Sequence, residues 1–159
     1  MLLAHGAAHA WAQRRSAGDT VSWRAGVPLP TPAGVVPAQE VVGGFPELLR
    51  DGADMLGTQT VRPEFGEQRH PRTAIGWSAD RARLFFVIVD GRQAPYSDGM
   101  TLRELSWLFR RISASAALNL DGGGSTALVV RGRLLNRPSD REGERPVGNA
   151  LVLAECGRQ

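Results

Sequence analysis

The amino-acid sequence predicts an α+β fold built on a mixed or mostly antiparallel sheet, with hairpins and one main amphipathic helix. Three patterns lead to this fold class. Residues 72–92 place two apolar runs around a short polar turn, residues 101–113 repeat apolar side chains at helical spacing, and predicted strands outnumber predicted helices. A chain of 159 residues with 42% hydrophobic content has the size and composition of one globular domain.

The first half of the chain carries the weaker signals of regular structure. Residues 6–17 predict a short helix, and residues 19–24 alternate like a strand. Residues 25–37 are rich in proline and glycine, which favours an extended connection. Residues 39–52 predict a short strand, a Gly-Gly turn and a second short apolar piece. Residues 53–71 are polar and poorly periodic, so they are expected to form a loop.

The second half predicts its elements more strongly. The 72–92 hairpin turns at Ser78–Arg81. Thr101 and Glu104 have the spacing of a capping box, which begins the helix of residues 101–113. The apolar side chains of this helix share one face, which is expected to pack on the sheet; they are Leu102, Leu105, Leu108, Phe109 and Ile112.

Three more strand regions are expected toward the C-terminus. Residues 116–120 predict a short buried strand that leads into a run of glycines. Residues 126–136 predict a second hairpin around Gly132, and residues 146–154 predict a closing strand.

Composition excludes several classes of function. All 19 basic residues are arginine, which excludes a lysine Schiff base and a Walker-A phosphate loop. The net charge of +3 comes without a basic stripe, so nucleic-acid binding is not expected. Cys156 is the single cysteine, which excludes an internal disulfide and a cysteine zinc site. No metal or cofactor is predicted, no apolar run reaches the roughly 20 residues of a membrane-spanning helix, and the sequence sets no oligomeric state.

The stretch AALNLDGGGSTALVV, residues 116–130, points to a binding site. Three consecutive glycines cost backbone entropy when they become ordered, and a structural loop usually needs only one. Three together expose several N–H groups and admit a close ligand oxygen, as in an anion-binding nest. A purely structural turn is the alternative interpretation.

Polar clusters stand at the ends of four predicted strands, where a rigid scaffold holds functional loops. They are HPRT at 70–73, VDGR at 89–92, NLDGGGST at 119–126 and NRPSD at 136–140. Taken singly, VDGR and NRPSD also fit ordinary turns. Antiparallel pairing in the first hairpin would bring Arg72 and residues 90–92 to the same end, where arginines add bidentate charge for an anion such as phosphate.

These four motifs in this order, closed by an apolar strand, resemble the phosphodiester glycosidase family. The resemblance is clear over residues 41–153 and extends to a single domain of residues 1–154, followed by a tail of residues 155–159. It implies hydrolysis of a sugar joined through its anomeric carbon to a phosphodiester, which releases the sugar and a phosphomonoester. It also implies an exported or cell-envelope protein, with bacterial relatives connected to exopolysaccharides.

The resemblance carries the family's functional residues onto the four motifs. The expected catalytic residues are Asp121, Asp90 and Arg72. The position of Asp121 beside the predicted anion nest favours it as nucleophile or base, with Asp90 supporting. The expected substrate- and phosphate-binding residues are Thr73, Gly91, Arg92, Asn119, Gly122, Gly123, Gly124, Ser125, Asn136, Arg137, Ser139 and Asp140.

One departure from the family bears on activity. Family members usually have an upstream part of the domain with an Asn-Gly-Gly-Phe-Phe-like segment, and this chain begins too late to contain it. The alternatives to an enzyme are therefore a module that binds sugar phosphates or glycans without cleaving them, and an inactive fragment.

Overall fold

The computed structural model describes residues 9–16, 18–20 and 42–154, and the chain divides into two units, Met1–Val42 and Gly43–Gln159. In the first unit, helix α1 (His9–Ala12) lies within the helix predicted for residues 6–17. Most of the predicted strand 19–24, the connection 25–37 and the tail 155–159 lie outside the described residues.

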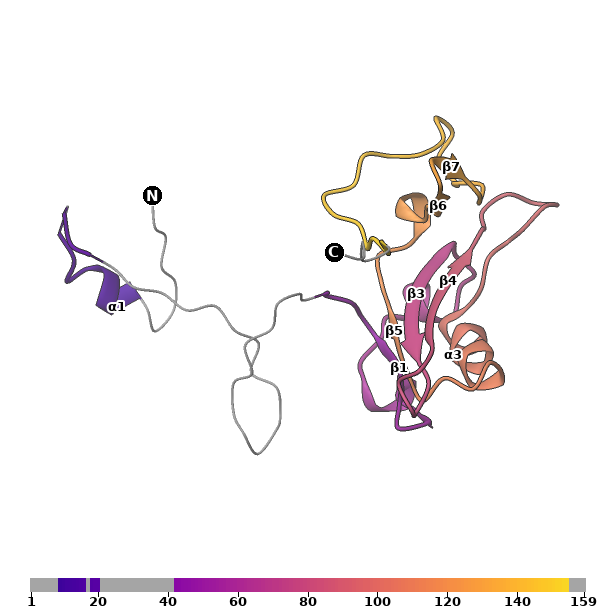
Figure 1. Ribbon diagram of the computed structural model, residues 1–159, viewed down its shortest axis with the longest axis horizontal. Coiled ribbons are helices and arrows are strands. Elements are labelled where there is room, and N and C mark those ends of the chain that lie inside the picture. Colours follow the sequence, from indigo (N-terminus) through magenta and orange to yellow (C-terminus); the bar gives the residue numbers. More distant parts are fainter. Residues whose placement is uncertain (1–8, 17, 21–41, 155–159) are drawn as a thin grey trace, which may run out of the picture. The chain divides into compact units, whose positions relative to one another are not determined.

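The second unit is built on a five-stranded sheet in which every strand pair is antiparallel, so the predicted fold class is confirmed. Figure 1 shows its central strands side by side. The order across the sheet is β2 (Ala53–Asp54), β1 (Glu47–Arg50), β5 (Ala116–Asn119), β3 (Arg72–Trp77) and β4 (Leu84–Val89).

Strands β3 and β4 form the hairpin that the sequence predicts. Their register runs from the Arg72–Val89 pair to the Trp77–Leu84 pair. The connecting turn is fastened by the Ser78 hydroxyl, which donates to the Asp80 carboxylate and accepts from the Arg83 amide. This register confirms that Arg72 and the residues after Val89 lie at the same end of the hairpin.

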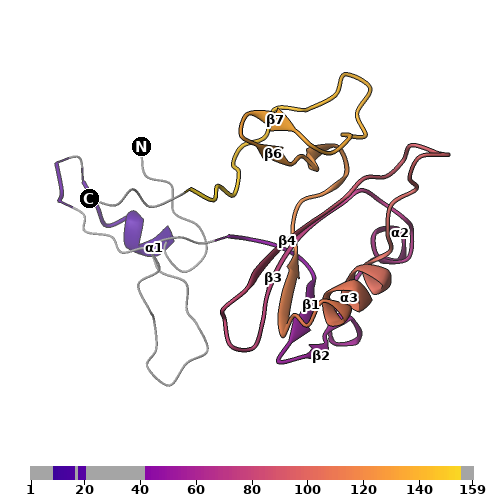
Figure 2. The ribbon, with the colours of Figure 1, turned by 45° about the vertical axis from the view of Figure 1, so that its right-hand side comes forward.

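Helix α3 (Leu102–Arg111) covers one face of the sheet, and Figure 2 shows it on the same side as α2 (Pro63–Gly66). The predicted capping box is present: the Thr101 hydroxyl accepts from the Glu104 amide, while the Glu104 carboxylate accepts from the Thr101 amide. This second bond lowers the pKa of Glu104. The buried apolar side chains form one core, namely Leu48, Leu49, Ala74, Leu102, Leu105, Phe109, Ala114 and Ala117.

Close approach of α3 to the sheet depends on Gly76 in β3. A Cβ atom at this position would lie 2.7 Å from the Phe109 ring and from the Ala116 carbonyl oxygen. A side chain there would push the helix off the sheet, which explains a glycine inside a strand that otherwise favours larger residues.

Residues 53–71 contain short elements where the sequence predicts a loop. They are β2, the 3₁₀ turn η2 (Leu56–Thr58) and α2 (Pro63–Gly66). Each is too short to show a hydrophobic period, so the prediction of a loop was wrong in detail. Pro63 stands at the first turn of α2, where its missing N–H has no helical partner to lose.

Beyond the sheet, β6 (Val129–Val130) and β7 (Arg133–Leu134) form the second predicted hairpin, with shorter strands than expected. Its turn residues Arg131 and Gly132 both have positive φ, as a two-residue hairpin turn requires. The predicted closing strand 146–154 was wrong, since these residues pair with no described strand and leave Val152 and Leu153 each 82% exposed. Alternating apolar residues favour a strand, but a strand forms only where a neighbouring strand is available to pair with it.

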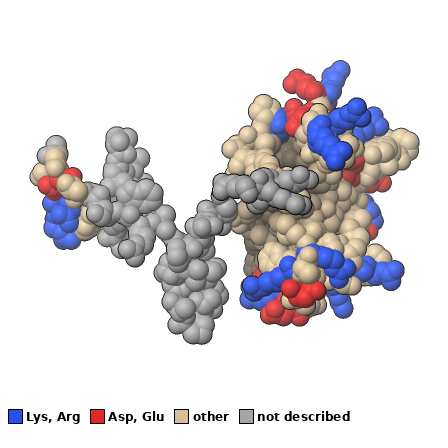
Figure 3. All heavy atoms as spheres, viewed as in Figure 1, with Lys and Arg blue, Asp and Glu red and all other residues tan. Residues whose placement is uncertain are grey.

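The sheet face opposite α3 presents apolar side chains to solvent. The Trp77–Leu84 pair and Phe86 are 39%, 50% and 41% exposed, whereas Phe85 and Val87 point the other way and pack on the core. Figure 3 shows charged side chains of this unit gathered at two ends, with an uncharged surface between them. No helix among the described residues is long and apolar enough to cross a membrane.

The capping box gives a stability prediction. Replacing Thr101 by alanine removes the hydroxyl that accepts from the Glu104 amide, so Thr101→Ala is expected to lower the free energy of unfolding by about 1 kcal/mol. Urea denaturation followed by circular dichroism measures this change.

Thr101→Ser is the matched control, because serine keeps the capping hydroxyl and is expected to stay within about 0.5 kcal/mol of the parent. Equal losses in the alanine and serine variants would mean that the threonine methyl group, and not the cap, stabilises the helix.

Candidate functional site

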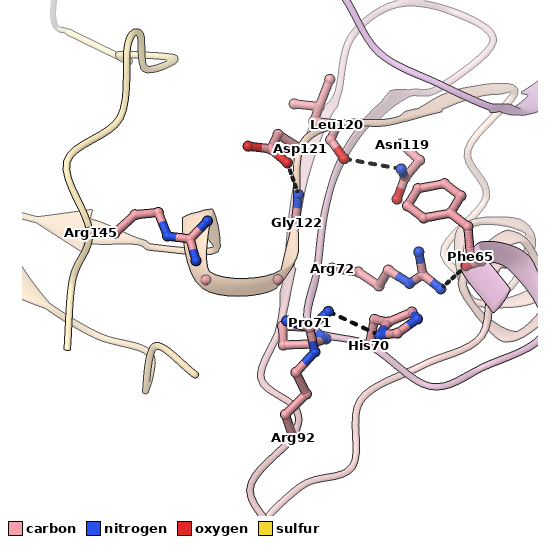
Figure 4. A pocket seen from close by; sticks show the side chains of 12 residues that line it. Phe65, His70, Pro71, Arg72, Arg92, Asn119, Leu120, Asp121, Gly122 and Arg145 are labelled. Atoms are coloured by element: carbon pink, nitrogen blue, oxygen red, sulfur yellow. Dashed lines mark hydrogen bonds between the residues drawn. The ribbon is translucent and has the colours of Figure 1, made fainter. Parts of the chain in front are cut away.

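A cavity of about 240 Å³ opens where the glycine-rich loop meets the start of β3 (Figure 4). Segments before β3, after β4 and after β5 all contribute to its wall, together with Arg145 from the C-terminal part of the chain. The lining residues are Phe65, His70, Pro71, Arg72, Arg92, Asn119, Leu120, Asp121, Gly122, Gly123, Gly124 and Arg145.

Antiparallel pairing explains why these segments converge. β3 lies between β4 and β5, with Arg72 opposite Val89 and Ala74 opposite Asn119. The last residues of β4 and β5 therefore flank the first residues of β3. The loops that follow both neighbouring strands leave the sheet at the Arg72 end.

The glycine-rich loop does not form the open anion nest that the sequence predicts. The Gly122 amide donates to the Asp121 carboxylate at 2.9 Å, and the Gly123 amide donates to the Pro71 carbonyl at 3.0 Å. The Ser125 amide donates to the Gly122 carbonyl within the turn η3 (Gly123–Ser125). Among the three glycine amides, that of Gly124 is the one without a partner in the described part of the chain.

The three glycines are explained by how closely other groups approach them. A Cβ at Gly122 would lie 2.8 Å from the Pro71 carbonyl oxygen. Gly123 has φ +62°, and a Cβ there would lie 3.1 Å from the Arg92 guanidinium. A Cβ at Gly124 would overlap the Asp140 carboxylate and the Arg145 guanidinium. The missing side chains thus make room for two arginines at the cavity.

Arg72 is a buried guanidinium in the cavity wall, with 1% of its surface exposed. Its Nε donates to the Met100 carbonyl at 2.9 Å, and its Nη2 donates to the Phe65 and Gln68 carbonyls at 2.6 and 3.1 Å. Burial, and then the charge of Arg92, lowers the pKa of Arg72 to about 10. The group is still a cation at neutral pH.

Arg92 is held beside Gly123 by His70. The backbone of Arg92 is left-handed, with φ 58°, and its Nη2 lies 3.2 Å from His70 Nδ1. His70 Nε2 lies 2.9 Å from the Glu64 carbonyl oxygen. A carbonyl only accepts, so Nε2 carries the proton and Nδ1 accepts from Arg92. A neutral imidazole therefore orients this guanidinium.

The cavity carries more positive than negative charge. Arg145 is paired with Asp140, which accepts from its Nε at 2.7 Å. Among the described residues, neither Arg72 nor Arg92 has a carboxylate within 4.0 Å. Asp121 is the one carboxylate among the lining residues, and its side chain is exposed at the rim.

Asp90 does not line this cavity, unlike Arg72 and Asp121. Its carboxylate accepts from the Asn136 side chain at 3.0 Å, from the Arg137 amide at 3.0 Å and from the Tyr96 hydroxyl at 2.9 Å. The Arg137 guanidinium lies 5.2 Å from the Tyr96 ring. Asp90 therefore braces the loop after β7 against the loop after β4.

The other expected site residues also have packing or bracing contacts. The Thr73 hydroxyl donates to Thr126 at 3.2 Å, and Gly91 is buried against the Pro71 and Gly99 backbones. The Ser139 hydroxyl is buried without a hydrogen bond to any described residue. No cluster of three His, Cys, Asp or Glu residues in the described part of the chain could hold a metal ion.

Several lining residues were not expected from the sequence. His70 and Pro71 belong to the HPRT motif but were not assigned to the site, and Leu120 separates two residues that were. Phe65 lies in a segment predicted as a loop. Arg145 comes from an arginine- and glutamate-rich loop in which no local pattern distinguishes it from its neighbours.

A family model and two curated relatives show which known proteins this chain is similar to. The model of the phosphodiester glycosidase family matches residues 6–154. The SPbeta prophage-derived uncharacterized protein YomE of Bacillus subtilis (strain 168) is 38% identical over 86 residues, which cover 54% of this chain and 13% of that protein. The Mus musculus N-acetylglucosamine-1-phosphodiester alpha-N-acetylglucosaminidase is 36% identical over 69 residues, 43% of this chain and 13% of that enzyme.

A solved structure supports the same likeness. It is the zebrafish N-acetylglucosamine-1-phosphodiester alpha-N-acetylglucosaminidase catalytic domain auto-inhibited by its pro-peptide, with a TM-score of 0.55 and 28% identity. The likeness covers 67% of this chain and 37% of the solved one. The chain thus spans a minor part of each of these relatives.

The contact between Asp90 and Tyr96 gives a titration prediction. Tyr96 is the single tyrosine of the chain, and the hydrogen bond and charge of Asp90 raise the pKa of its phenol above the ordinary value. The tyrosinate absorbance is expected to rise at a higher pH than in a model peptide. In Asp90→Asn the midpoint is expected to move back toward the ordinary value.

Asp80→Asn, at the opposite end of the β3–β4 hairpin, is the control and leaves the Tyr96 midpoint unchanged. An ordinary Tyr96 midpoint in the parent chain would contradict the bracing role of Asp90.

Proposed function

The chain belongs to the phosphodiester glycosidase family, and on that premise we propose that its cavity binds a sugar-1-phosphodiester and hydrolyses it to the free sugar and a phosphomonoester. An α-N-acetylglucosaminyl phosphodiester is the proposed substrate type, since this group appears in the names of the mouse and zebrafish relatives.

The observation that supports this proposal is uncompensated positive charge. Arg72 is buried and Arg92 lies beside it, and neither has a carboxylate partner among the described residues. Two neighbouring cations without a counter-ion give the cavity a positive potential, which attracts an anionic ligand. A phosphodiester carries one negative charge and has oxygen acceptors that suit guanidinium donors.

In the proposed mechanism, arginines assist the departure of the phosphate. A phosphomonoester is already a good leaving group, so stabilisation of charge on the departing oxygen matters more than a strong general acid. Arg92 and Arg145 would supply this stabilisation from the glycine-rich side of the cavity. Asp121 would act as the nucleophile or as the base toward water.

Asp90 is proposed as a positioning residue. Its three hydrogen-bond donors keep it engaged with the Asn136–Arg137 loop and Tyr96. Gly91 and Arg92 are the next two residues of the chain after Asp90. Asp90 would therefore act by fixing the chain that delivers Arg92 to the cavity.

A second candidate function is binding without cleavage, as a sugar-phosphate or glycan module. It is favoured by the lining residues, which include one carboxylate where glycoside hydrolysis usually employs a pair. We also propose an exported or cell-envelope location and a bacterial role in exopolysaccharide metabolism, on the family resemblance alone.

Activity is tested by incubating the chain with UDP-N-acetylglucosamine or a synthetic sugar phosphodiester and measuring free sugar. Turnover is expected in the parent chain, and Asp121→Asn is expected to reduce kcat by roughly 100-fold or more. Asp51→Asn is the control, because this residue lies in an exposed turn far along the chain and its left-handed backbone tolerates asparagine. Near-normal turnover by a folded Asp121→Asn variant would remove Asp121 from the mechanism.

Anion binding is tested separately, by calorimetry with inorganic phosphate and with N-acetylglucosamine 1-phosphate. Arg92→Gln removes a guanidinium donor and is expected to raise the Kd for both ligands by roughly tenfold or more. Arg81→Gln is a matched control, since Arg81 has the same φ of 58° but sits in the turn between β3 and β4. Equal affinities in the two variants would contradict the assignment, whereas tight binding without turnover in the parent chain would favour the binding module.

A further inference from the structure

A buried acceptor in the cavity wall has no partner. Asn119 is 1% exposed, and its Nδ2 donates to the Phe45 carbonyl at 2.7 Å and to the Leu120 carbonyl at 3.0 Å. These two carbonyls fix the orientation of the carboxamide, because the amide nitrogen must face them. Its Oδ1 is buried and accepts no hydrogen bond from any described residue.

The Arg72 guanidinium leaves a donor unused in the same wall. Its Nε and Nη2 bind three backbone carbonyls, whereas its Nη1 has no hydrogen bond to a described residue. Both residues line the cavity, and in Figure 4 the Asn119 oxygen lies on the side of the carboxamide that faces Arg72. Asn119 pairs with Ala74, two residues along β3 from Arg72, so the wall offers one acceptor and one donor on the same face of the sheet.

An unpaired buried carbonyl costs free energy, so the site calls for a group that donates to Asn119. An ionised phosphate oxygen only accepts, and beside Asn119 Oδ1 it would meet a second acceptor. A hydroxyl both donates and accepts, so it satisfies Asn119 and Arg72 at once.

We propose that Asn119 Oδ1 and Arg72 Nη1 form a subsite for one hydroxyl of the sugar, which donates to the carboxamide and accepts from the guanidinium. This inference rests on the proposed function and adds an orientation to it. The sugar ring lies toward Asn119, Arg72 and Phe65, and the phosphate lies toward Arg92, Gly123 and Arg145. Figure 4 shows Arg145 on the opposite side of the cavity from Phe65 and Arg72.

The two parts of the ligand therefore have different requirements. The phosphate end needs positive charge, which Arg92 supplies without a carboxylate partner among the described residues. The sugar end needs a hydrogen-bond donor, and a site built to pair a hydroxyl rejects an analogue that lacks it more strongly than an apolar pocket rejects a size change. Asn119 would act as a specificity-determining residue.

The test changes the ligand, because substitution of Asn119 would also break its two bonds to backbone carbonyls. Binding of N-acetylglucosamine 1-phosphate to the full chain is compared with binding of analogues in which each hydroxyl of the sugar, the exocyclic one included, is in turn replaced by fluorine, which cannot donate. Inorganic phosphate is the control ligand. The carboxamide carbon of Asn119 is followed by NMR during each titration.

One fluorinated analogue is expected to bind roughly tenfold or more weakly than the parent sugar phosphate. The Asn119 signal is expected to shift with the parent ligand, but not with that analogue at equal saturation and not with inorganic phosphate.

Every other outcome contradicts either the hydroxyl subsite or the proposed function. If all analogues bind within roughly twofold of the parent, or if a sensitive analogue leaves the Asn119 signal behaving as the parent ligand does, the hydroxyl subsite is overturned and anion binding stands. An ordered water bridging Asn119 and Arg72 would give the first of these results. If neither phosphate nor the sugar phosphate binds, the proposed function itself fails.

Discussion

The position of β3 between β4 and β5 is the constraint on which the site depends. Both neighbouring strands run antiparallel to β3, so both deliver their following loops to the Arg72 end of the sheet. Arg72 is the first residue of β3, and its guanidinium fastens the preceding segment through the Phe65 and Gln68 carbonyls. β3 thus pairs with both of its neighbouring strands, and its first residue, Arg72, holds part of the cavity wall in place.

The run of glycines is explained by the space that two arginine side chains occupy beside the loop, and not by a need for free amide donors. Two of its amides are directed to Asp121 and Pro71, while its missing side chains leave space for Arg92 and Arg145. This space lets the Arg92 guanidinium lie beside Gly123 and the Arg145 guanidinium beside Gly124. Neutral His70 assists by orienting Arg92 without adding another positive charge.

Sequence patterns predicted the elements that have a clear period or a turn signal. The β3–β4 hairpin, α3 with its Thr101 cap, and β5 belong to this class. The closing strand failed because pairing depends on a neighbour that alternation does not reveal. In the site, the pairing predicted for the first hairpin was enough to bring Arg72 and Arg92 to the same end of the sheet. It did not show that Asp90 faces Tyr96 and Arg137, because side-chain direction depends on packing between loops distant in sequence.

In the described part of the chain, the sheet face opposite α3 is exposed, which has a practical consequence for handling the protein. Trp77, Leu84 and Phe86 offer an apolar platform of the kind that recruits other surfaces or causes aggregation. Environment-sensitive dyes would adsorb there before any unfolding, giving a bright baseline in thermal-shift assays that could be mistaken for a molten state. Intrinsic tryptophan emission needs no added dye and is therefore a safer reporter of unfolding.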